Sequence, residues 1–347
     1  KLVQSIFMLG PFFRRETSLD LIHPGPQCPN EGYSGKMRFL SPLLISVFLL
    51  ACPDPEGLQP GGGGGGSGSI ALNLTSVTTG DGYSCGISVS GGLVCWGASI
   101  DGLTNPPVGR FTDISAGYAS VCEIADDGGL HCRGDDQWGR VSEAPTGTYS
   151  QVSVRHGHAC AVARNGSIEC WGLDDRGQAS PPSGAFTKVT TGRSHSCAIT
   201  IDGSVECWGQ LDNEEEGPYN LPEGNGWIDI SAGGYHTCAA HSLGEVHCWG
   251  WRDAPGSGTG PDESIPEPPA KGFVQISSGE QHTCGISHES EIFCWGQDAD
   301  TSIGQRDEGQ TDHPSGELWE SIAAGFDHSC AIKTDGSTHC WGGNRYG

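Results

Sequence analysis

The chain has 347 residues, of which 56 are glycine, 21 are proline and 16 are cysteine, and its formal net charge is −24. This composition favours short strands and turns over helices, and the excess of acid excludes nucleic acid as a natural partner because it repels phosphate. Many cysteines with no Cys-x-x-Cys pair indicate an oxidising compartment and give no support to a zinc ribbon.

The N-terminal part predicts an export signal followed by a tether. Residues 37–52 read MRFLSPLLISVFLLAC, with a start methionine, an arginine and an apolar run too short to span a bilayer. The ending LLAC resembles the lipobox of bacterial lipoproteins, which would make Cys52 the lipidated first residue; the alternative is ordinary signal cleavage. Residues 53–69 are rich in Pro and Gly and predict a flexible linker. We interpret residues 1–36 as upstream sequence outside the working protein.

From residue 74 onward the chain contains seven repeats. Each repeat carries two cysteines ten residues apart, and Trp-Gly follows the second cysteine in six of them. A glycine stands five residues before the first cysteine in six repeats, and Arg155 takes its place in the third. The cysteine pairs are Cys85 and Cys95, Cys122 and Cys132, Cys160 and Cys170, Cys197 and Cys207, Cys238 and Cys248, Cys284 and Cys294, and Cys330 and Cys340.

The spacing within a repeat predicts a hairpin, as residues 196–209 (SCAITIDGSVECWG) illustrate. Alternating apolar residues indicate two strands, and the loop Ile-Asp-Gly between them sets the register. Cys197 then lies directly opposite Cys207, at the separation of about 4.5–5.5 Å that a disulfide accepts. We therefore predict a disulfide in every repeat rather than free thiols. The loop glycine recurs in six repeats, and Ser290 replaces it in the other, which predicts a strained or different turn there.

The repeat length predicts how these units assemble. First cysteines of successive repeats stand 37 to 46 residues apart, which suits four short strands per unit and is too long for a β-helix coil. Closure into a ring leaves only short edges exposed, whereas an open solenoid needs capping repeats that the sequence lacks. The predicted fold class is therefore all-β, a seven-bladed β-propeller over residues 70–347 with one intra-blade disulfide per repeat.

The motif G-x-x-H-x-C-A-I-x-x-D-G-x-V-x-C-W-G at residues 192–209 resembles the repeat of the regulator of chromosome condensation family, over about residues 74–347. The resemblance implies the propeller fold but no single function, because propellers host many activities. In setting, the chain is most similar to secreted bacterial propellers like beta-lactamase inhibitor protein II. The cysteine pairs and the lipobox depart from the nuclear members and count against guanine-nucleotide exchange.

A histidine stands two residues before the first cysteine in five repeats: His158, His195, His236, His282 and His328. One interpretation is a ring of metal ligands around the channel. The other is a repeated structural hydrogen bond from imidazole to backbone, which the family resemblance also implies. Because one ligand per blade makes no local cluster at metal spacing, we predict the structural role and no metal.

Three aromatic residues do not follow the repeat: Trp138, Tyr219 and Trp251 lie in the variable loops after Trp-Gly. Such loops are where the aromatic anchors of a binding face are expected, although partly exposed aromatic residues are also common. No catalytic or cofactor-binding motif is present in the sequence.

We therefore predict a monomeric lipoprotein without enzymatic activity or cofactor, held outside the cytoplasm at the cell surface or in the periplasm. Its partner would be a protein or another macromolecule, bound through one loop-rich face, and it would meet the membrane only through its lipid. The alternative function is a secreted enzyme inhibitor. A surface glycan-acting enzyme and a guanine-nucleotide exchange factor have less support.

Overall fold

The computed structural model divides into two compact units, Lys1–Leu58 and Gln59–Gly347. The residues that it describes are 68–70, 72–98, 102–210, 221–250, 267–296 and 308–343, all within the second unit. The predicted signal segment and Cys52 lie outside these ranges. No helix in the described ranges is long and apolar enough to cross a membrane.

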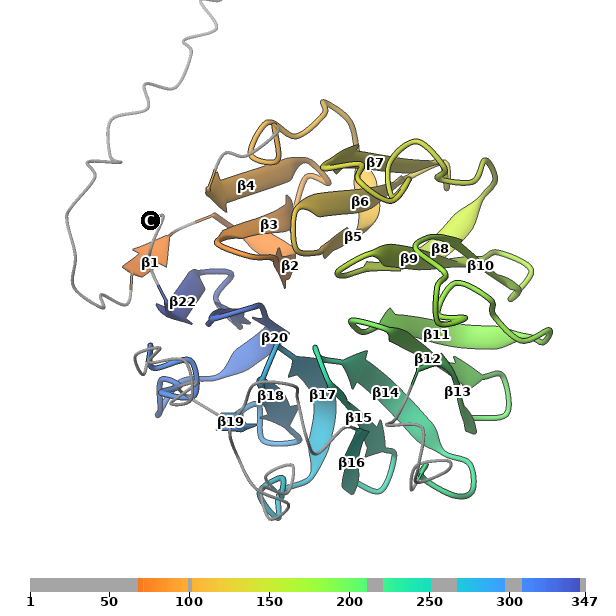
Figure 1. Cartoon of the computed structure of the whole chain (residues 1–347). Helices are drawn as coiled ribbons and strands as arrows, with labels where there is room; N and C mark the ends of the chain where they lie inside the picture. The colour runs from red at the N-terminus through yellow and green to blue at the C-terminus, as the bar shows by residue number, and fades with distance from the viewer. Residues whose placement is uncertain are drawn as a thin grey trace, which may run out of the picture. The chain divides into compact units, whose positions relative to one another are not determined.

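The second unit is a propeller of seven antiparallel sheets, the blades, arranged around a central axis (Figure 1). Within a blade the strands follow one another in chain order, and the first strands of neighbouring blades contact each other around the ring. The first strand of each blade is therefore the innermost. The predicted all-β, seven-bladed fold is confirmed.

The strands are short and regular. They are β2 (Leu74–Thr79), β3 (Tyr83–Ser88) and β4 (Leu93–Gly97) in blade 1; β5 (Phe111–Ala116), β6 (Ser120–Ala125) and β7 (Leu130–Gly134) in blade 2; β8 (Tyr149–Val154), β9 (His158–Ala163) and β10 (Ile168–Gly172) in blade 3; β11 (Phe186–Thr191), β12 (His195–Thr200) and β13 (Val205–Gly209) in blade 4; β14 (Trp227–Ala232), β15 (His236–His241) and β16 (Val246–Gly250) in blade 5; β17 (Phe273–Ser278), β18 (His282–Ser287) and β19 (Ile292–Gly296) in blade 6; and β20 (Trp319–Ala324), β21 (His328–Lys333) and β22 (Thr338–Gly342) in blade 7.

Most described blades have three strands rather than the four that the repeat length predicts. The loop 135–148 after blade 2, described throughout, contains no strand but inserts the buried side chain of Arg140 beside blade 3. There the indole N–H of Trp171 donates a hydrogen bond of 2.8 Å to the Arg140 carbonyl. The same bond joins Trp208 to Gln178 and Trp341 to Gln310. In blades 3 and 4 the preceding loop thus covers the outer strand in place of a fourth strand.

All seven predicted disulfides are present, one in each blade between the middle and outer strands. They join Cys85 to Cys95, Cys122 to Cys132, Cys160 to Cys170, Cys197 to Cys207, Cys238 to Cys248, Cys284 to Cys294, and Cys330 to Cys340. In blade 4 the two cysteines are direct partners across the hairpin, and Ile199 lies opposite Val205 as the register requires. Their Cα atoms are 4.0 Å apart, somewhat closer than the spacing of opposed residues predicts.

The two ends of each disulfide differ in burial. The first cysteine, on the middle strand, is fully buried, whereas the second cysteine, on the outer strand, is half-buried in every blade. The middle strand has a paired strand on both sides within its own sheet, whereas the outer strand has one on a single side in every blade but blade 7. The disulfides therefore fasten the less protected strand to the core of the blade.

The hydrophobic core lies between neighbouring blades. Val162 of blade 3, for example, packs in one buried cluster with Phe186, Val189 and Ala198 of blade 4. The small side chain that follows the first cysteine in most repeats leaves room for this inter-blade packing, as Ala198 does. Each blade therefore depends on its neighbours for burial of its faces.

The ring closes through a strand that precedes the first repeat. Residues Gly68–Ile70 form β1, which pairs antiparallel with β22 and makes blade 7 four-stranded (Figure 1). The chain then continues directly into β2 of blade 1. The segment from β1 to β2 therefore connects the last blade covalently to the first.

The repeated histidines join neighbouring blades. In each case Nε2 lies within hydrogen-bond distance of a Ser or Thr hydroxyl on the next blade. The pairs are His158 and Ser196 (2.7 Å), His195 and Thr237 (2.8 Å), His236 and Thr283 (2.7 Å), His282 and Ser329 (2.9 Å), and His328 and Ser84 (2.9 Å). The histidines thus have a structural role, but their partner is a side-chain hydroxyl rather than the backbone that the sequence suggested. We call these five pairs the blade latches.

The two remaining blade boundaries lack such a hydroxyl on the next blade, because Val121 and Ala159 occupy its position. Blade 1 has Tyr83 in place of the histidine, and its hydroxyl donates to backbone carbonyls of blade 2, at 2.8 Å to Ser120 and 3.1 Å to Gly117. Blade 2 has Ser120 in place of the histidine. At both boundaries, therefore, the histidine and the hydroxyl residue that would face it are replaced together.

Candidate binding site at the channel mouth

The seven turns that connect inner to middle strands surround one end of the central axis. The residue directly after the repeat's glycine position is a different amino acid in every turn. These residues, which we call the mouth ring, are Asp81, Tyr118, His156, Arg193, Gly234, Glu280 and Phe326. Because seven different residues occupy this position in otherwise similar repeats, the fold does not require a particular side chain there.

Backbone hydrogen bonds between neighbouring turns fix the mouth ring. The N–H groups of Tyr118, Glu280 and Phe326 donate to the carbonyl of the next blade's turn at 3.0, 3.0 and 3.3 Å. The turns approach so closely that a Cβ atom on Gly325 would lie 2.8 Å from the carbonyl oxygen of Gly80. At such positions a side chain would collide with the next turn, which accounts for the recurrence of glycine.

Arg155 replaces this glycine in blade 3 and extends across the channel. Its guanidinium donates to the carbonyls of Ala232 at 3.2 Å and Ser278 at 3.0 Å, on blades 5 and 6. The carboxylate of Glu280 lies 3.5 Å from the same guanidinium. Burial lowers the pKa of Arg155, and Glu280 opposes that shift. The residue that breaks the repeat therefore bridges blades that are not neighbours.

The charged side of the mouth has two cations around one anion. Glu280 also lies 3.7 Å from Arg193, whose guanidinium stands 5.3 Å over the ring of Tyr235. Burial lowers the pKa of His156, and the neighbouring Arg193 lowers it further. His156, which lies between this side and the aromatic residues, is therefore neutral at pH 7 and adds no third cation to the mouth.

The other side of the mouth is a row of rings. The ring centroids of Phe326 and Tyr118 are 6.4 Å apart, those of Tyr118 and His156 are 5.6 Å apart, and those of His156 and Trp138 are 5.5 Å apart. Arg140 stands 5.2 Å over the Trp138 ring. Tyr118 is 47 % exposed and Phe326 is 37 % exposed. Exposed aromatic residues gathered at one place are typical of a binding surface.

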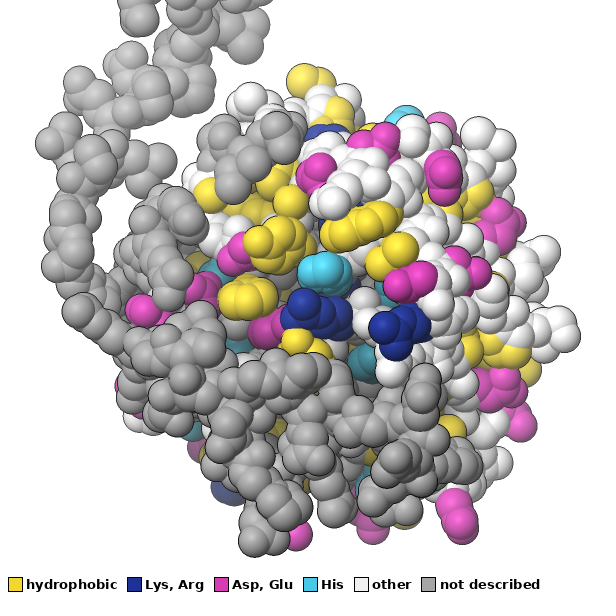
Figure 2. Space-filling model, viewed as in Figure 1, with side chains coloured by type: hydrophobic (Ala, Val, Ile, Leu, Met, Phe, Trp, Pro, Cys, Tyr) yellow, Lys and Arg dark blue, Asp and Glu magenta, His cyan; other side chains and the backbone are white. Residues whose placement is uncertain are grey.

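Between the two sides lies a cavity of about 260 Å³. Its lining combines Tyr118 and Phe326 with Arg155, Arg193 and Glu280, above a floor of small and glycine residues. Figure 2 shows the same residue types near the middle of the face in view, with Lys or Arg side chains beside a His and hydrophobic side chains. The mouth can therefore hold an apolar group and a charged group at the same time.

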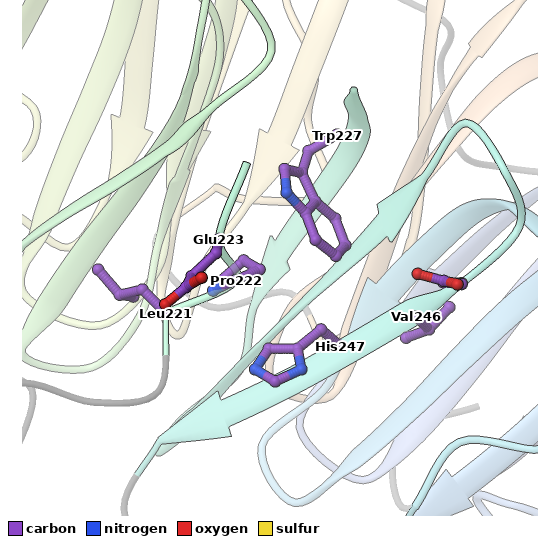
Figure 3. Close-up of a pocket in the computed structure, with 7 residues that line it drawn as sticks. Leu221, Pro222, Glu223, Trp227, Val246 and His247 are labelled. Carbon is purple, nitrogen blue, oxygen red and sulfur yellow. The ribbon is translucent and has the colours of Figure 1, made fainter. Parts of the chain in front are cut away.

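A second cavity of about 620 Å³ lies at the rim of blade 5. Figure 3 shows Trp227 and Glu223 on one side of it and His247, on β16, on the other. Residues 211–220 and 251–266, which stand close to its lining residues in the sequence, lie outside the described part of the chain, so we assign it no function. Over the ranges that the structure describes, no three His, Cys, Asp or Glu side chains gather as a metal site.

Of the predicted binding residues, Trp138 lies at the mouth, at the end of the aromatic row. Tyr219 and Trp251 lie outside the described residues. Sequence reasoning missed Tyr118, Arg193 and Phe326, because they stand in short turns of constant length. The signal that identifies them is the variability of the position after the repeated glycine.

Comparisons with known proteins agree with this architecture. The family model described as "Regulator of chromosome condensation (RCC1) repeat" matches residues 186–215, 227–253, 273–300 and 319–347, which correspond to blades 4 to 7. Among curated proteins, a serine/threonine-protein kinase-like protein CCR2 of Arabidopsis thaliana is 36 % identical over 59 residues. That match covers 17 % of this chain and only 8 % of the relative.

Three solved structures share the fold at low sequence identity. The CRINKLY WD40 ectodomain of the Arabidopsis thaliana receptor kinase ACR4 is 23 % identical with a TM-score of 0.59, over 78 % of this chain and 95 % of that one. The ectodomain of the Physcomitrella patens receptor kinase CR4 is 21 % identical with a TM-score of 0.61, over 78 % and 73 %. Prp20p from Saccharomyces cerevisiae is 13 % identical with a TM-score of 0.58, over 78 % and 83 %. Blades 4 to 7 are thus regulator of chromosome condensation repeats, and the chain is an RCC1-like β-propeller.

Proposed function

We propose that this propeller is a non-enzymatic binding module that engages a protein partner through the mouth ring. The observation that carries the proposal is the mouth itself, where exposed rings and a charged cluster line one cavity on a fixed backbone. Side chains held by a rigid frame lose little conformational entropy when a partner binds. The frame here is the closed ring of disulfide-bonded blades.

The proposal that the partner is a protein is supported by solved propellers of similar fold. Prp20p is described with binding properties to Gsp1p and histones, and yeast RCC1 was solved bound to Kap60. Those partners belong to those proteins, and none is carried over to this chain. What the comparison supports is the use of an RCC1-like propeller as a protein-binding platform.

We further propose that the module works outside the cytoplasm, held by a lipid on Cys52. Seven disulfides persist only in an oxidising compartment, and the structures with a similar fold include receptor kinase ectodomains. A single substitution tests the anchor. Cys52→Ser should move the protein from the membrane fraction to the soluble secreted fraction, with its disulfides unchanged. A variant that stays with the membrane would contradict lipidation at Cys52.

Photo-cross-linking tests the binding face. Benzoylphenylalanine is placed at Tyr118 in the full chain, and in a control chain at Ile201, which is 76 % exposed in a hairpin loop at the opposite ends of the strands. After irradiation of cells that secrete each chain, we expect a protein adduct from position 118 that excess unmodified protein competes away. An adduct from position 201 alone, or equal adducts from both, would place binding elsewhere.

A further inference from the structure

We infer that the mouth accepts a partner segment in which a large apolar or aromatic side chain stands next to a carboxylate. The inference rests on the proposed function and gives the chemistry of the ligand. It follows from the two unlike sides of the cavity, from its volume and from the placement of charge around the mouth ring.

The aromatic side offers a tilted pair rather than a flat platform. The planes of Phe326 and Tyr118 meet at 69°, and both rings border the cavity. A third ring can pack edge-to-face into such a pair, which is the geometry that aromatic side chains prefer. A sugar ring stacks on one flat face instead, so the tilt favours a side chain of a protein over a glycan.

On the charged side, the positive charge of Arg193 is only partly balanced. Its carboxylate neighbour, Glu280, also pairs with Arg155, which is bonded to two backbone carbonyls as well. The Arg193 side chain is 44 % exposed, so part of it is accessible from the cavity. A carboxylate from the partner would complete its pairing, and charge-assisted bonds of this kind are stronger than neutral ones.

Arg193 sets the direction of the bound segment. It stands on blade 4, whereas Phe326 and Tyr118 stand on blades 7 and 2, on either side of blade 1. In a ring of seven, blades 1 and 4 are as far apart as any two can be. A ligand carboxylate is attracted toward Arg193, so the acidic group of the segment points toward blade 4.

The volume limits what enters. A cavity of about 260 Å³ is smaller than the sites of about 300–1,000 Å³ that hold drug-sized ligands. The floor is made of backbone and glycines whose positions are fixed by close approach, so it cannot deepen. One large side chain therefore fills most of the cavity, and its acidic neighbour pairs with the exposed part of Arg193.

Selection from a phage-displayed library of short random peptides on the full-length protein tests this. We expect enriched peptides to carry Phe, Tyr, Trp or Leu next to Asp or Glu. Tyr118→Ala and Phe326→Ala should each weaken the enriched peptides about tenfold or more, as expected for the anchors of an interface. Ile201→Ala, at the opposite end of blade 4, should leave binding unchanged.

A charge reversal provides the sharpest control. Selection on Arg193→Glu should replace the acidic residue of the enriched peptides by Lys or Arg while the aromatic residue stays, and thermal unfolding confirms that the variant is folded. If that variant does not fold, Arg193→Gln should still select the aromatic residue but lose the acidic one. Enriched peptides without the pair, peptides insensitive to these variants, or binding of a glycan array in place of peptides would each overturn the inference. If adducts from position 118 persisted in cells, the proposed function would survive that failure.

Discussion

At the scale of single residues, departures from the repeat compensate one another. In blade 2 Arg133 replaces the repeated tryptophan, and the buried Glu123 stands where other repeats have Ala or Gly. Their side chains lie 3.4 Å apart, and the guanidinium donates to the Leu103 carbonyl as the tryptophan N–H groups do to their loops. Burial raises the pKa of Glu123 to about 7, against the lowering effect of Arg133.

This pair should therefore behave as a unit. Arg133→Trp alone leaves Glu123 buried without its cation and should lower the free energy of unfolding by about 3 kcal/mol at pH 8, where the carboxylate is charged. The double variant with Glu123→Ala restores the common repeat and should recover most of that loss, because replacing both members of a buried pair is often neutral. Denaturant unfolding of the three proteins measures both effects. A double variant as unstable as the single one would contradict the coupling.

A second residue-scale prediction concerns Ser290, the one replacement of the hairpin glycine. Its φ is +62°, in the left-handed region, and its N–H bonds to the Ser287 carbonyl at 2.9 Å as in the glycine hairpins. The turn is thus the same but strained, as the sequence predicts. Ser290→Gly should raise the free energy of unfolding by about 0.5–1 kcal/mol. The left-handed conformation costs a non-glycine residue about 1–2 kcal/mol, and glycine avoids this cost but loses more backbone entropy on folding.

The converse substitution serves as the control. Gly336→Ser places a side chain at the equivalent turn of blade 7, where φ is +83°. It should destabilise the protein by a similar amount in denaturant unfolding. Equal stability of all three proteins would show that the left-handed turn carries no strain.

At the scale of the elements, the blade latches make the contacts between sheets sensitive to acid. Burial lowers the pKa of His158, His236 and His282 to about 3 and that of His195 to about 4. Each folded pKa is below the unfolded value of about 6.5, so the unfolded chain binds more protons between these values. The stability from neutral histidines is therefore complete above pH 6.5 and is lost as pH falls toward 3 to 4.

Two carboxyl groups act in the opposite direction. Burial raises the pKa of Asp113 to about 6 and that of Glu123 to about 7, so their contribution is largest in acid and declines as pH rises through those values. Four histidines against two carboxyls leave a net loss of stability on acidification from pH 6 to 4. Each histidine contributes a slope of up to about 1.4 kcal/mol per pH unit.

We therefore expect the free energy of unfolding to fall steeply between pH 6 and 4. His236→Gln, which removes one titrating latch, should be less stable at pH 7.5 and should show a shallower slope below pH 6. Denaturant unfolding at a series of pH values measures both. A flat profile, or the same slope in the variant, would mean that the latches do not titrate in this way.

The parts that sequence predicts are those that depend on local spacing. Cys197 and Cys207 meet because a short hairpin connects them. The strained turn at Ser290 could be predicted because Ser290 replaces the glycine of an equally short hairpin loop. The missing fourth strand depends on a contact between distant segments, such as Trp208 with Gln178. Tyr118 and Phe326 become neighbours only when the ring closes, because they stand on blades 2 and 7.

At the scale of the whole propeller, one blade boundary differs from the rest. At six boundaries a Ser or Thr of the inner strand accepts an N–H from the next inner strand, as Ser153 does from Thr191 at 3.0 Å. Between blades 7 and 1, Ala323 occupies that position. The latch of His328 with Ser84 and the chain from β1 to β2 hold this boundary instead.

Ring closure should therefore depend on β1. Deletion of residues 68–70 removes the pairing with β22 and should lower the free energy of unfolding by about 1–3 kcal/mol, at about 1 kcal/mol per hydrogen bond lost. Amide exchange should accelerate first in blades 7 and 1. The matched control is a deletion of the same length, residues 61–63, which are three glycines. Equal effects of the two deletions, or acceleration spread evenly over all blades, would contradict closure through β1.

The disulfides never leave their own blade, and this has a consequence for biosynthesis. Fourteen repeat cysteines admit on the order of 10⁵ pairings, yet each correct pair lies within one hairpin of a few residues. Because a short hairpin forms in microseconds and oxidation takes seconds or longer, the partners are already opposed when an oxidant reaches them. A chain made from its N-terminus can thus oxidise repeat by repeat, with no need for an isomerase to correct crossed pairs.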